Sequence, residues 1–334
     1  MIKAYAAFEQ GGELKPFEYD PGTLPDDQVE IAVEHCGICH SDLSMLNNEW
    51  GMTQYPFVPG HEIVGKVIEV GARVKSLNVG QTVGLGWHSG YCMSCSSCHS
   101  GDHNLCSSAQ GTIIGHHGGF ADKVRAEESS VVPLPEGLDE SVVAPLFCAG
   151  VTVFNPLLEL GIKPTDTVGI IGIGGLGHLA VQFLRAWGCE VWAFTSSEAK
   201  KTEALELGAH YTVDSKNPDE IKALAGKFNL LLSTVNVKLN WNQYVNALAP
   251  KGKLHFVGAT LEPLDLNVFS LMAGQRSVSS SPVGSPQALR SMLSFAKRHD
   301  IEPKVERFSF DQVNEAIARL ESGKAHYRII LSRN

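Results

Sequence analysis

The sequence predicts an α/β protein with two domains, and three features support this prediction. The chain has 334 residues, more than a single hydrophobic core usually serves. Residues 1 to about 150 hold short runs of β-forming residues separated by glycine and proline. From about residue 155 to 285, apolar runs alternate with amphipathic helical patterns. This alternation is typical of a doubly wound parallel sheet with helices on both faces.

The expected strands and helices follow from hydrophobic periodicity and from the turn residues between them. The strands of the first domain are expected in residues 26–37, 62–71 and 81–87. The strands of the second domain are expected in residues 166–172, 189–195, 228–235 and 253–259, and its helices in 176–187 and 198–208. Two further helices are expected in residues 286–300 and 309–324, and a last strand in 326–332.

The composition narrows the class of protein. A hydrophobic content of 43% with 19% charged residues is typical of a globular protein. No apolar run is long enough for a membrane helix, and the first twenty residues lack the pattern of a signal peptide. The net charge of −9 argues against nucleic acid as a partner. The eight cysteines are too sparse for a disulfide scaffold, and four lie within fifteen residues, which favours metal binding in a reducing cytoplasm.

A glycine-rich turn, "GIGGLG" at residues 172–177, follows an apolar strand and opens a helix. In this context the pattern G-x-G-x-x-G indicates a dinucleotide-binding turn. Gly172 permits the tight turn, Gly174 lets the backbone approach a pyrophosphate, and Gly177 lets helix and strand pack closely. With Gly175 and Leu176, these residues lead into a helix N-terminus that favours an anion. A glycine turn without a ligand is the alternative.

The end of the following strand indicates which dinucleotide binds. An acidic residue there would accept hydrogen bonds from the ribose of NAD. Here the strand ends at Thr195 and continues into Ser196 and Ser197, with Lys200 and Lys201 beyond. Hydroxyls and lysines suit a 2′-phosphate, so the sequence predicts NADP(H). Serine and threonine are also ordinary helix N-caps, and this interpretation stays open.

Four cysteines form one candidate metal site. Cys92, Cys95, Cys98 and Cys106 are separated by two, two and seven residues in a lobe at about residues 88–110. Four thiolates can close a tetrahedral zinc site that has no open position, which predicts a structural zinc. An iron–sulfur cluster is the chemical alternative.

A second candidate metal site involves the stretch "HCGICHSD", residues 35–42. Cys36 and Cys39 have the C-x-x-C spacing of a shared metal site or a redox pair. A catalytic zinc needs about three protein ligands and one open position. His61, Glu62 and Cys148 are suitable residue types. Spacing alone does not tie them to Cys39, because they are far apart in the sequence.

The motifs "CGICHSD", "PGHEIVG", "CAGVTVF" and "GIGGLG" occur in a fixed order together with the four-cysteine lobe. In this order the whole chain resembles the zinc-dependent medium-chain dehydrogenase/reductases. It resembles most closely the cinnamyl alcohol dehydrogenase subgroup and bacterial NADPH-dependent aldehyde reductases of broad substrate range. The resemblance implies a GroES-like catalytic domain at 1–152, a Rossmann cofactor-binding domain at 153–287, and a return to the catalytic domain at 288–334.

The resemblance also implies which of Cys36 and Cys39 binds metal. Cys39, His61 and Cys148 would hold a catalytic zinc, and Cys36 would not be a ligand. Glu62 would lie behind the metal and could enter its coordination shell.

Further roles follow from the same resemblance. Asp42 would orient His61, Ser41 would begin a proton relay, and His40 would face the cofactor pyrophosphate. Many relatives carry a histidine where this chain has Ser44, so the outer end of the relay stays open. The remaining implied contacts are Thr152 for the cofactor, and Trp50 and Trp87 for the substrate pocket. Either tryptophan could instead be an ordinary core residue.

The resemblance implies a function for the whole chain. It would be a zinc-dependent, NADPH-preferring enzyme that reversibly reduces aldehydes to primary alcohols, with zinc polarising the carbonyl and Ser41 relaying the proton. We expect two zinc ions per chain, a small-molecule substrate, and a cytoplasmic homodimer that binds neither nucleic acid nor membranes. The alternative is an NAD-dependent alcohol or polyol dehydrogenase on the same fold, which would place an acidic residue where Thr195 stands.

Overall fold

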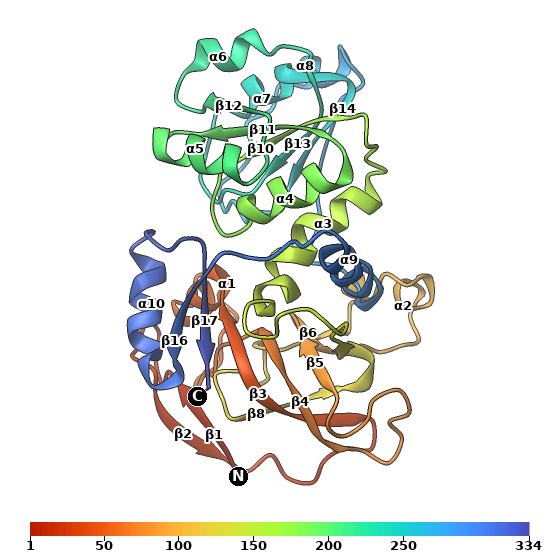
Figure 1. The fold of residues 1–334 in the computed structure, drawn as a ribbon, viewed down its shortest axis with the longest axis vertical. Coiled ribbons are helices and arrows are strands. Elements are labelled where there is room, and N and C mark those ends of the chain that lie inside the picture. Colours follow the sequence, from red (N-terminus) through yellow and green to blue (C-terminus); the bar gives the residue numbers. More distant parts are fainter. Residues whose placement is uncertain (334) are drawn as a thin grey trace. The chain divides into compact units, whose positions relative to one another are not determined.

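The computed structural model describes residues 1–333, which form two compact units (Figure 1). The first unit combines Met1–Val151 with the described residues from Gly284 onward, and the second is Thr152–Val283. These divisions differ by one and four residues from the predicted domain bounds. Thr152 therefore belongs to the second unit. Helix α9 (Pro286–Arg298) belongs to the first, where Met292 approaches Gly150.

Within the described residues, the main sheet of the first unit has seven strands. Six follow the order β16-β17-β3-β4-β5-β9, and β8 pairs with β3. Their bounds are β3 Gln28–Ile38, β4 Glu62–Val70, β5 Thr82–Leu85, β8 Lys123–Glu127, β9 Val132–Pro133, β16 Val305–Ser309 and β17 Arg328–Ser332. Buried side chains such as Ile31, Val33 and Phe120 fill the core beneath this sheet.

The register of this sheet brings distant segments to one place. Gly37 of β3 pairs with Glu62 of β4, and Ile38 pairs with Ile329 of β17. The C-terminal end of β3 therefore lies beside the first residues of both β4 and β17. Helix α1 (His40–Leu46) begins directly after β3, so its first residues lie at the same end of the sheet.

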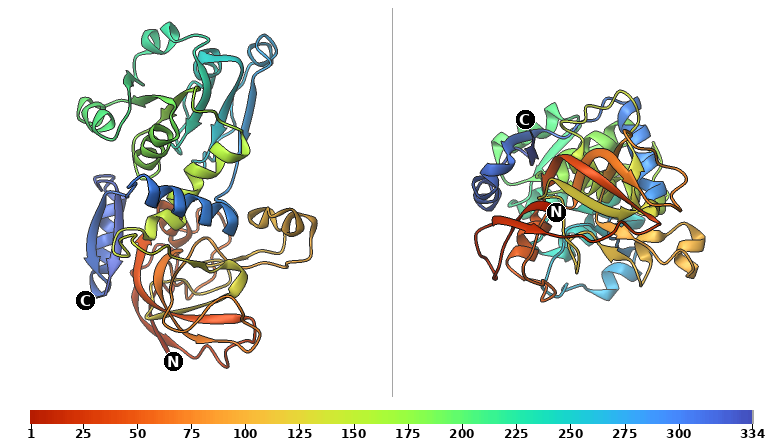
Figure 2. Two further views of the ribbon diagram at one scale, coloured as in Figure 1. Left: turned by 45° about the vertical axis from the view of Figure 1, so that its right-hand side comes forward. Right: turned by 90° about the horizontal axis from the view of Figure 1, so that it is seen from below.

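The other elements of the first unit are short. They are β1 Ile2–Ala6, β2 Lys15–Tyr19, β6 His88–Gly90, β7 Gln110–Gly111, α2 Ser96–Ser100 and α10 Val313–Glu321. The lobe that carries α2 stands out from the first unit (Figures 1 and 2).

The second unit is a parallel sheet in the order β12-β11-β10-β13-β14-β15. The strands are β10 Thr167–Ile171, β11 Glu190–Thr195, β12 Tyr211–Asp214, β13 Phe228–Ser233, β14 Leu248–Phe256 and β15 Ser277–Ser280. The helices are α3 Ala149–Glu159, which begins in the first unit, α4 Gly177–Trp187, α5 Glu198–Glu206, α6 Pro218–Ala223, α7 Trp241–Ala247 and α8 Val268–Met272. The strand order reverses between β10 and β13, and doubly wound sheets bind ligands outside the carboxyl ends of the strands at such a point.

The predicted strands and helices are confirmed, with shifts at their ends. Strand β14 begins at Leu248, five residues earlier than expected, and it runs through Pro250 and Gly252, residue types that usually interrupt strands. Several short strands were not predicted, among them β1, β2 and β16; β2 and β16 have no fully buried residue. No helix among residues 1–333 is long and apolar enough to cross a membrane.

Candidate active site

Four side chains from separate segments converge at the end of the first unit's sheet. Cys39, His61, Glu62 and Cys148 each offer a ligand atom, and these atoms lie within 4.8 Å of one another. Cys39 Sγ and Cys148 Sγ are 4.0 Å apart, and His61 Nε2 lies 3.3 Å from Cys148 Sγ. Ligands of tetrahedral zinc with bonds of about 2.3 Å lie roughly 3.8 Å apart. The donor set of two thiols, an imidazole and a carboxylate therefore fits zinc in both chemistry and spacing.

Asp42 holds Cys39 and His61 in place through its two carboxylate oxygens. One carboxylate oxygen, Oδ1, lies 3.0 Å from His61 Nδ1 and accepts the backbone N–H of Gly60 at 2.8 Å. The other oxygen, Oδ2, accepts the N–H of Cys39 at 2.9 Å, which caps the start of α1. Since Asp42 and His61 are both fully buried, this contact leaves Nε2 of His61 turned toward the thiols. Such a carboxylate is the usual support of a metal-binding histidine.

Arg328, the first residue of β17, was not predicted as a member of the site. Its side chain is 6% exposed and forms an ion pair with Glu62, whose side chain is fully buried. The Oε2 atom of Glu62 has no hydrogen-bond partner among the described residues. Gly37 makes room for this carboxylate, because a Cβ there would lie 2.0 Å from Oε2. A single arginine in the apolar run "HYRIILS" was the only available signal.

The charges of these buried groups are strongly coupled. Burial raises the pKa of Glu62 to about 7, although the Arg328 charge opposes this shift. The pKa of Cys39 lies well below its usual value, because Cys148 donates a hydrogen bond to it and Arg328 and His61 add positive charge. The pKa of His61 is well above its usual value, because the Asp42 charge outweighs burial. The surroundings thus favour a thiolate at Cys39, the form that binds metal.

The other residues predicted for this region lie on α1 or beside His61. Ser41 Oγ is 3.8 Å from Cys39 Sγ, and His40 is exposed at the start of the helix. Cys36 is buried on β3 and is not one of the four donors.

Trp87 lies against the donor group, with its ring 4.9 Å from that of His61 at 85°. It also lines a cavity of about 360 Å³ together with His88, Gln110, Ile114 and His116, among others. Trp50 is not a lining residue of this cavity, but its ring packs on Trp87 at 6.1 Å.

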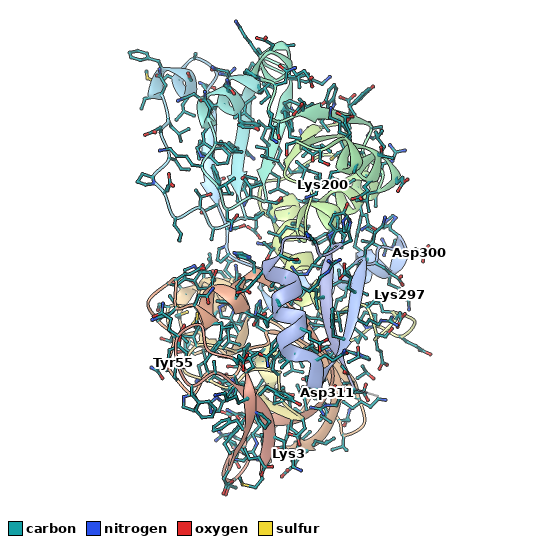
Figure 3. The ribbon with its side chains drawn as sticks, turned by 90° about the vertical axis from the view of Figure 1, so that its left-hand side faces the viewer. Lys3, Tyr55, Lys200, Lys297, Asp300 and Asp311 are labelled. Atoms are coloured by element: carbon teal, nitrogen blue, oxygen red, sulfur yellow. The ribbon has the colours of Figure 1, made fainter. Side chains whose placement is uncertain are left out.

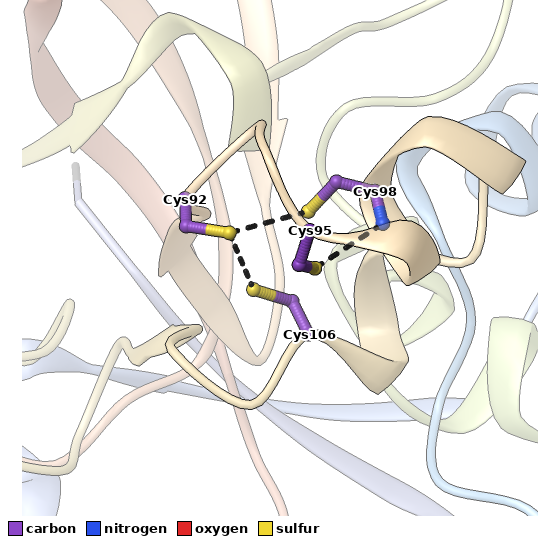
Figure 4. A group of neighbouring side chains, drawn as sticks. All are labelled: Cys92, Cys95, Cys98 and Cys106. Carbon is purple, nitrogen blue, oxygen red and sulfur yellow. Dashed lines mark hydrogen bonds between the residues drawn. The ribbon is translucent and has the colours of Figure 1, made fainter.

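The four cysteines of the projecting lobe also converge (Figure 4). Cys92, Cys95, Cys98 and Cys106 have their sulfur atoms within 4.8 Å of one another. Cys92 Sγ lies 4.0 Å from Cys98 Sγ and 3.5 Å from Cys106 Sγ. These separations suit a single ion with four sulfur ligands. Only a small cluster with Tyr91 packs around them, so the lobe has little hydrophobic core of its own.

The glycine turn in the second unit has the form expected for a pyrophosphate site. Gly172 has a positive φ of 93°, and a Cβ at Gly177 would lie 2.0 Å from the carbonyl oxygen of Gly172. Nothing lies within 4 Å of a Cβ built at Gly174, so the turn has open space beside that residue. Gly175 and Leu176 directly precede α4. In its first turn, the N–H groups of His178 and Leu179 donate to the carbonyls of Gly174 and Leu176. Thr152 lies apart in sequence on α3 and is buried.

The end of β11 presents the predicted hydroxyl and lysine groups. Thr195 is 4% exposed, Ser196 is exposed, and Ser197 is the N-cap of α5 without a side-chain cap hydrogen bond. The N-cap interpretation is therefore weakened for Ser197. Lys201 is paired with Glu198 at 2.6 Å, whereas Lys200 makes no ion pair with any residue in the described range. Figure 3 labels Lys200 on the second unit.

One carboxylate near this group was not predicted. Asp214, the last residue of β12, pairs directly with Thr195 in the parallel register. Its Oδ1 accepts the backbone N–H of Lys216 at 2.9 Å. A negative charge therefore lies on the strand next to the predicted phosphate site.

Comparison with known proteins agrees with both halves of this description. The model of the family described as "Alcohol dehydrogenase GroES-like domain" matches residues 25–136, and that described as "Zinc-binding dehydrogenase" matches residues 175–298. The aldehyde reductase AdhA of Synechocystis sp. is 65% identical over 334 residues, covering 100% of this chain and 99% of that protein.

Two solved structures have the same fold over nearly the full length. The cinnamyl alcohol dehydrogenase SbCAD4 from Sorghum bicolor has a TM-score of 0.95 at 36% identity, covering 99% of this chain and 97% of the other. The Helicobacter pylori enzyme, described as CAD complexed with NADP(H), has a TM-score of 0.92 at 30% identity with the same coverage. These matches show that the chain belongs to the zinc-dependent medium-chain dehydrogenase/reductases of the cinnamyl alcohol dehydrogenase type.

Proposed function

We propose that this protein reduces aldehydes to primary alcohols, reversibly, with NADPH as its preferred cofactor and two zinc ions per chain. The observation that carries the proposal is the donor group of Cys39, His61 and Cys148 with Asp42 behind the imidazole and Ser41 beside the thiol. The 65% identity to a protein named aldehyde reductase supports the direction of the reaction.

Several residues of the chain would orient the metal ligands, transfer the proton and exclude water. When bound here, zinc supplies a Lewis acid for the carbonyl oxygen, and NADPH supplies the hydride. Asp42 holds His61 in the orientation that metal binding needs. Arg328 neutralises Glu62, and we expect that it limits how readily Glu62 enters the coordination shell. Ser41 is close enough to the donor group to hand a proton to the substrate oxygen, and Trp87 offers an apolar wall that excludes water.

We assign the second zinc to the four cysteines of the lobe. Four thiolates leave no open coordination position, so this ion would be structural. It would replace the hydrophobic core that the lobe lacks, since metal binding supplies folding free energy to such segments.

The preference for NADPH rests on the end of β11. The hydroxyls of Thr195, Ser196 and Ser197 can donate to a 2′-phosphate, and Lys200 can add a charge-assisted hydrogen bond. The Helicobacter pylori relative is described as a complex with NADP(H), which is consistent with this assignment. Asp214 beside Thr195 is the observation that favours the alternative, NAD-dependent oxidation of alcohols or polyols.

The test is the ratio of kcat/KM for NADPH and NADH with benzaldehyde, in the wild type and two variants. We expect the wild type to prefer NADPH by on the order of 10²-fold, since two contacts of ~1.4 kcal/mol each correspond to that ratio. Thr195→Asp should reverse the preference by repelling the phosphate. Lys200→Ala should weaken NADPH alone, with Lys201→Ala as the matched control. A wild-type ratio in favour of NADH would support the alternative.

We further propose a homodimer in a reducing compartment. Strand β15 is the edge of its sheet, and the adjacent segment α8 exposes Val268, Phe269 and Met272 at 63%, 79% and 67%. An open strand edge with an exposed apolar helix favours association with a second copy. A reducing compartment would keep both cysteine groups as thiolates able to bind metal.

A further inference from the structure

We propose that His255 is a positioning residue for the cofactor. It holds the hydroxyl of Ser281 at the end of the second unit's sheet, where that hydroxyl binds the nicotinamide riboside. This inference rests on the proposed function, because it concerns the same cofactor. It concerns the end of the cofactor opposite to the 2′-phosphate that Thr195 is expected to bind.

The strand order assigns the two halves of a dinucleotide to the two halves of this sheet. A sheet with the order β12-β11-β10-β13-β14-β15 consists of two mononucleotide-binding halves, and the dinucleotide lies across their carboxyl ends. The glycine turn after β10 and Thr195 at the end of β11 belong to one half, which takes the adenosine and the pyrophosphate under the proposed function. The carboxyl ends of β13, β14 and β15 are therefore left for the nicotinamide riboside.

A buried histidine lies at this carboxyl end. His255 is the last residue but one of β14 and is 2% exposed. Its neighbours Leu254 and Phe256 belong to the hydrophobic core of the second unit, so His255 faces the opposite side of the sheet. Aliphatic residues are usual in a parallel sheet that is covered on both faces. A polar ring in such a place costs free energy unless its hydrogen bonds are made.

Two serines satisfy both ring nitrogens of His255. Nδ1 lies 2.9 Å from Ser279 Oγ, and Nε2 lies 2.9 Å from Ser281 Oγ. Ser279 pairs with His255 in the parallel register, and Ser281 directly follows the last residue of β15. Burial and the nearby charge of Lys253 lower the pKa of His255 to about 4. The neutral ring has one donor and one acceptor, so it determines which serine hydroxyl donates and which accepts.

Ser281 keeps hydrogen-bonding capacity for a ligand. A hydroxyl has one donor and two acceptor positions, and the contact with Nε2 uses only one of them. The carboxamide and the ribose of the nicotinamide riboside offer both donors and acceptors, so they suit this hydroxyl in either orientation. Two residues further on, Val283 has a φ of 23°, which β-branched residues rarely adopt. The contact with His255 thus anchors a segment whose backbone needs support from its surroundings.

The test measures, by calorimetry, how tightly the zinc-loaded protein binds NADPH and 2′-phospho-ADP, the part of NADPH without its nicotinamide riboside. Ser281→Ala should weaken NADPH binding roughly tenfold, within the range of one lost hydrogen bond, and leave 2′-phospho-ADP binding within twofold of wild type. The matched control is Ser277→Ala, an exposed serine at the start of β15, which should change neither affinity. Equal losses for both ligands, or unchanged NADPH binding, would overturn the proposal.

Two variants of His255 test whether it acts through Ser281. His255→Gln places its amide where Nε2 lies and can keep the contact with Ser281, whereas His255→Asn replaces Nδ1 and keeps only the contact with Ser279. We expect His255→Gln to bind NADPH like the wild type and His255→Asn to bind it like Ser281→Ala.

The double variant His255→Asn/Ser281→Ala should bind NADPH no more weakly than Ser281→Ala, because both changes remove the same contact. Equal NADPH affinities of the two His255 variants, or additive losses in the double variant, overturn the role of His255. Failure of the proposed function would differ, because the wild type would then bind NADH more tightly than NADPH. The same comparison can be made with NADH and ADP.

Discussion

Two cysteines three positions apart have different environments. Cys36 is fully buried, and its Sγ would lie 2.8 Å from a Cβ at Gly60 and 3.0 Å from one at Gly119. Burial raises its pKa well above the usual value, so this thiol is inert. Cys39 lies among the four donors. The spacing of the two residues therefore reflects where β3 ends and α1 begins.

We expect Cys39→Ser to lower the zinc content and Cys36→Ser to leave it unchanged. Elemental analysis should find two zinc ions per chain in the wild type and in Cys36→Ser, which should also keep nearly full turnover. Cys39→Ser should retain only the lobe's zinc and lose turnover, because a catalytic site needs its three protein ligands. Equal loss in both variants would mean that the two thiols share one site.

Residue roles could be predicted where a motif carries them and not elsewhere. The group of Cys39, His61, Glu62 and Cys148 was expected only through the family resemblance, and the structure brings these side chains together. Arg328 could not be predicted, because its partner Glu62 lies 266 positions away. Nothing in a strand of "RIILS" indicates that its first side chain turns toward a buried carboxylate.

The turn between β10 and α4 shows how an element depends on the absence of side chains. Gly177 has no room for a Cβ, since the Gly172 carbonyl oxygen would be 2.0 Å away, whereas Gly174 has nothing within 4 Å. Gly177 thus allows the helix to pack closely on the turn, and Gly174 leaves space for a ligand.

We expect Gly177→Ala to lower both the midpoint of thermal unfolding and the affinity for NADPH. Gly174→Ala should leave the unfolding midpoint nearly unchanged and weaken NADPH binding, because its methyl group would occupy the space where the pyrophosphate approaches. Calorimetry and fluorescence titration measure the two quantities. An equal loss of stability in both variants would contradict this division of roles.

A buried carboxylate ties β3 to β8. Glu30 is 4% exposed and accepts Lys123 Nζ at 2.9 Å and Arg125 Nε at 2.8 Å. Burial of Glu30 raises its pKa, but the hydrogen bonds and charges of Lys123 and Arg125 outweigh burial, and the net shift is downward. The folded state therefore favours the ionised form.

The downward shift of the Glu30 pKa predicts how the free energy of unfolding depends on pH. A carboxyl group whose pKa is lowered by folding contributes stability above its unfolded pKa, and the contribution is lost as the pH falls toward the folded pKa. Glu30→Gln should lower the free energy of unfolding by about 1.5–3 kcal/mol near neutral pH, typical of hydrogen bonds to charged groups. The difference from wild type should shrink below about pH 4.5. A difference that does not change with pH in urea unfolding would contradict the assignment.

Long elements with a clear hydrophobic period were predictable, whereas short or exposed strands were not. In strand β3, Val29, Ile31 and Val33 occupy alternate positions and are buried, so the sequence displays their common face directly. Strand β16, "VERFS", has no fully buried residue, so no apolar face marked it. Its place follows from pairing with β17, which is a tertiary effect outside the local sequence.

The proposed dimer can be tested with the whole chain of 36.1 kDa. We expect the wild type to sediment as a dimer at micromolar concentration and Phe269→Asp to shift toward the monomer, because the charge would be buried without a partner. Val79→Asp is the control, since Val79 is 62% exposed on the first unit. A wild-type monomer in sedimentation velocity would refute the dimer.

The order in which the chain is made has a consequence for the pairing of Glu62 with Arg328. On the ribosome Glu62 emerges long before Arg328, and the entire second unit is translated in the interval. That unit is one continuous segment, so it can fold while synthesis proceeds. The first unit cannot complete its fold until β17 has been synthesised, and until then Glu62 has no positive charge beside it. Zinc delivery before that moment would meet Glu62 without its counter-charge, so we expect the catalytic centre to mature after translation, as the last event in the biogenesis of the protein.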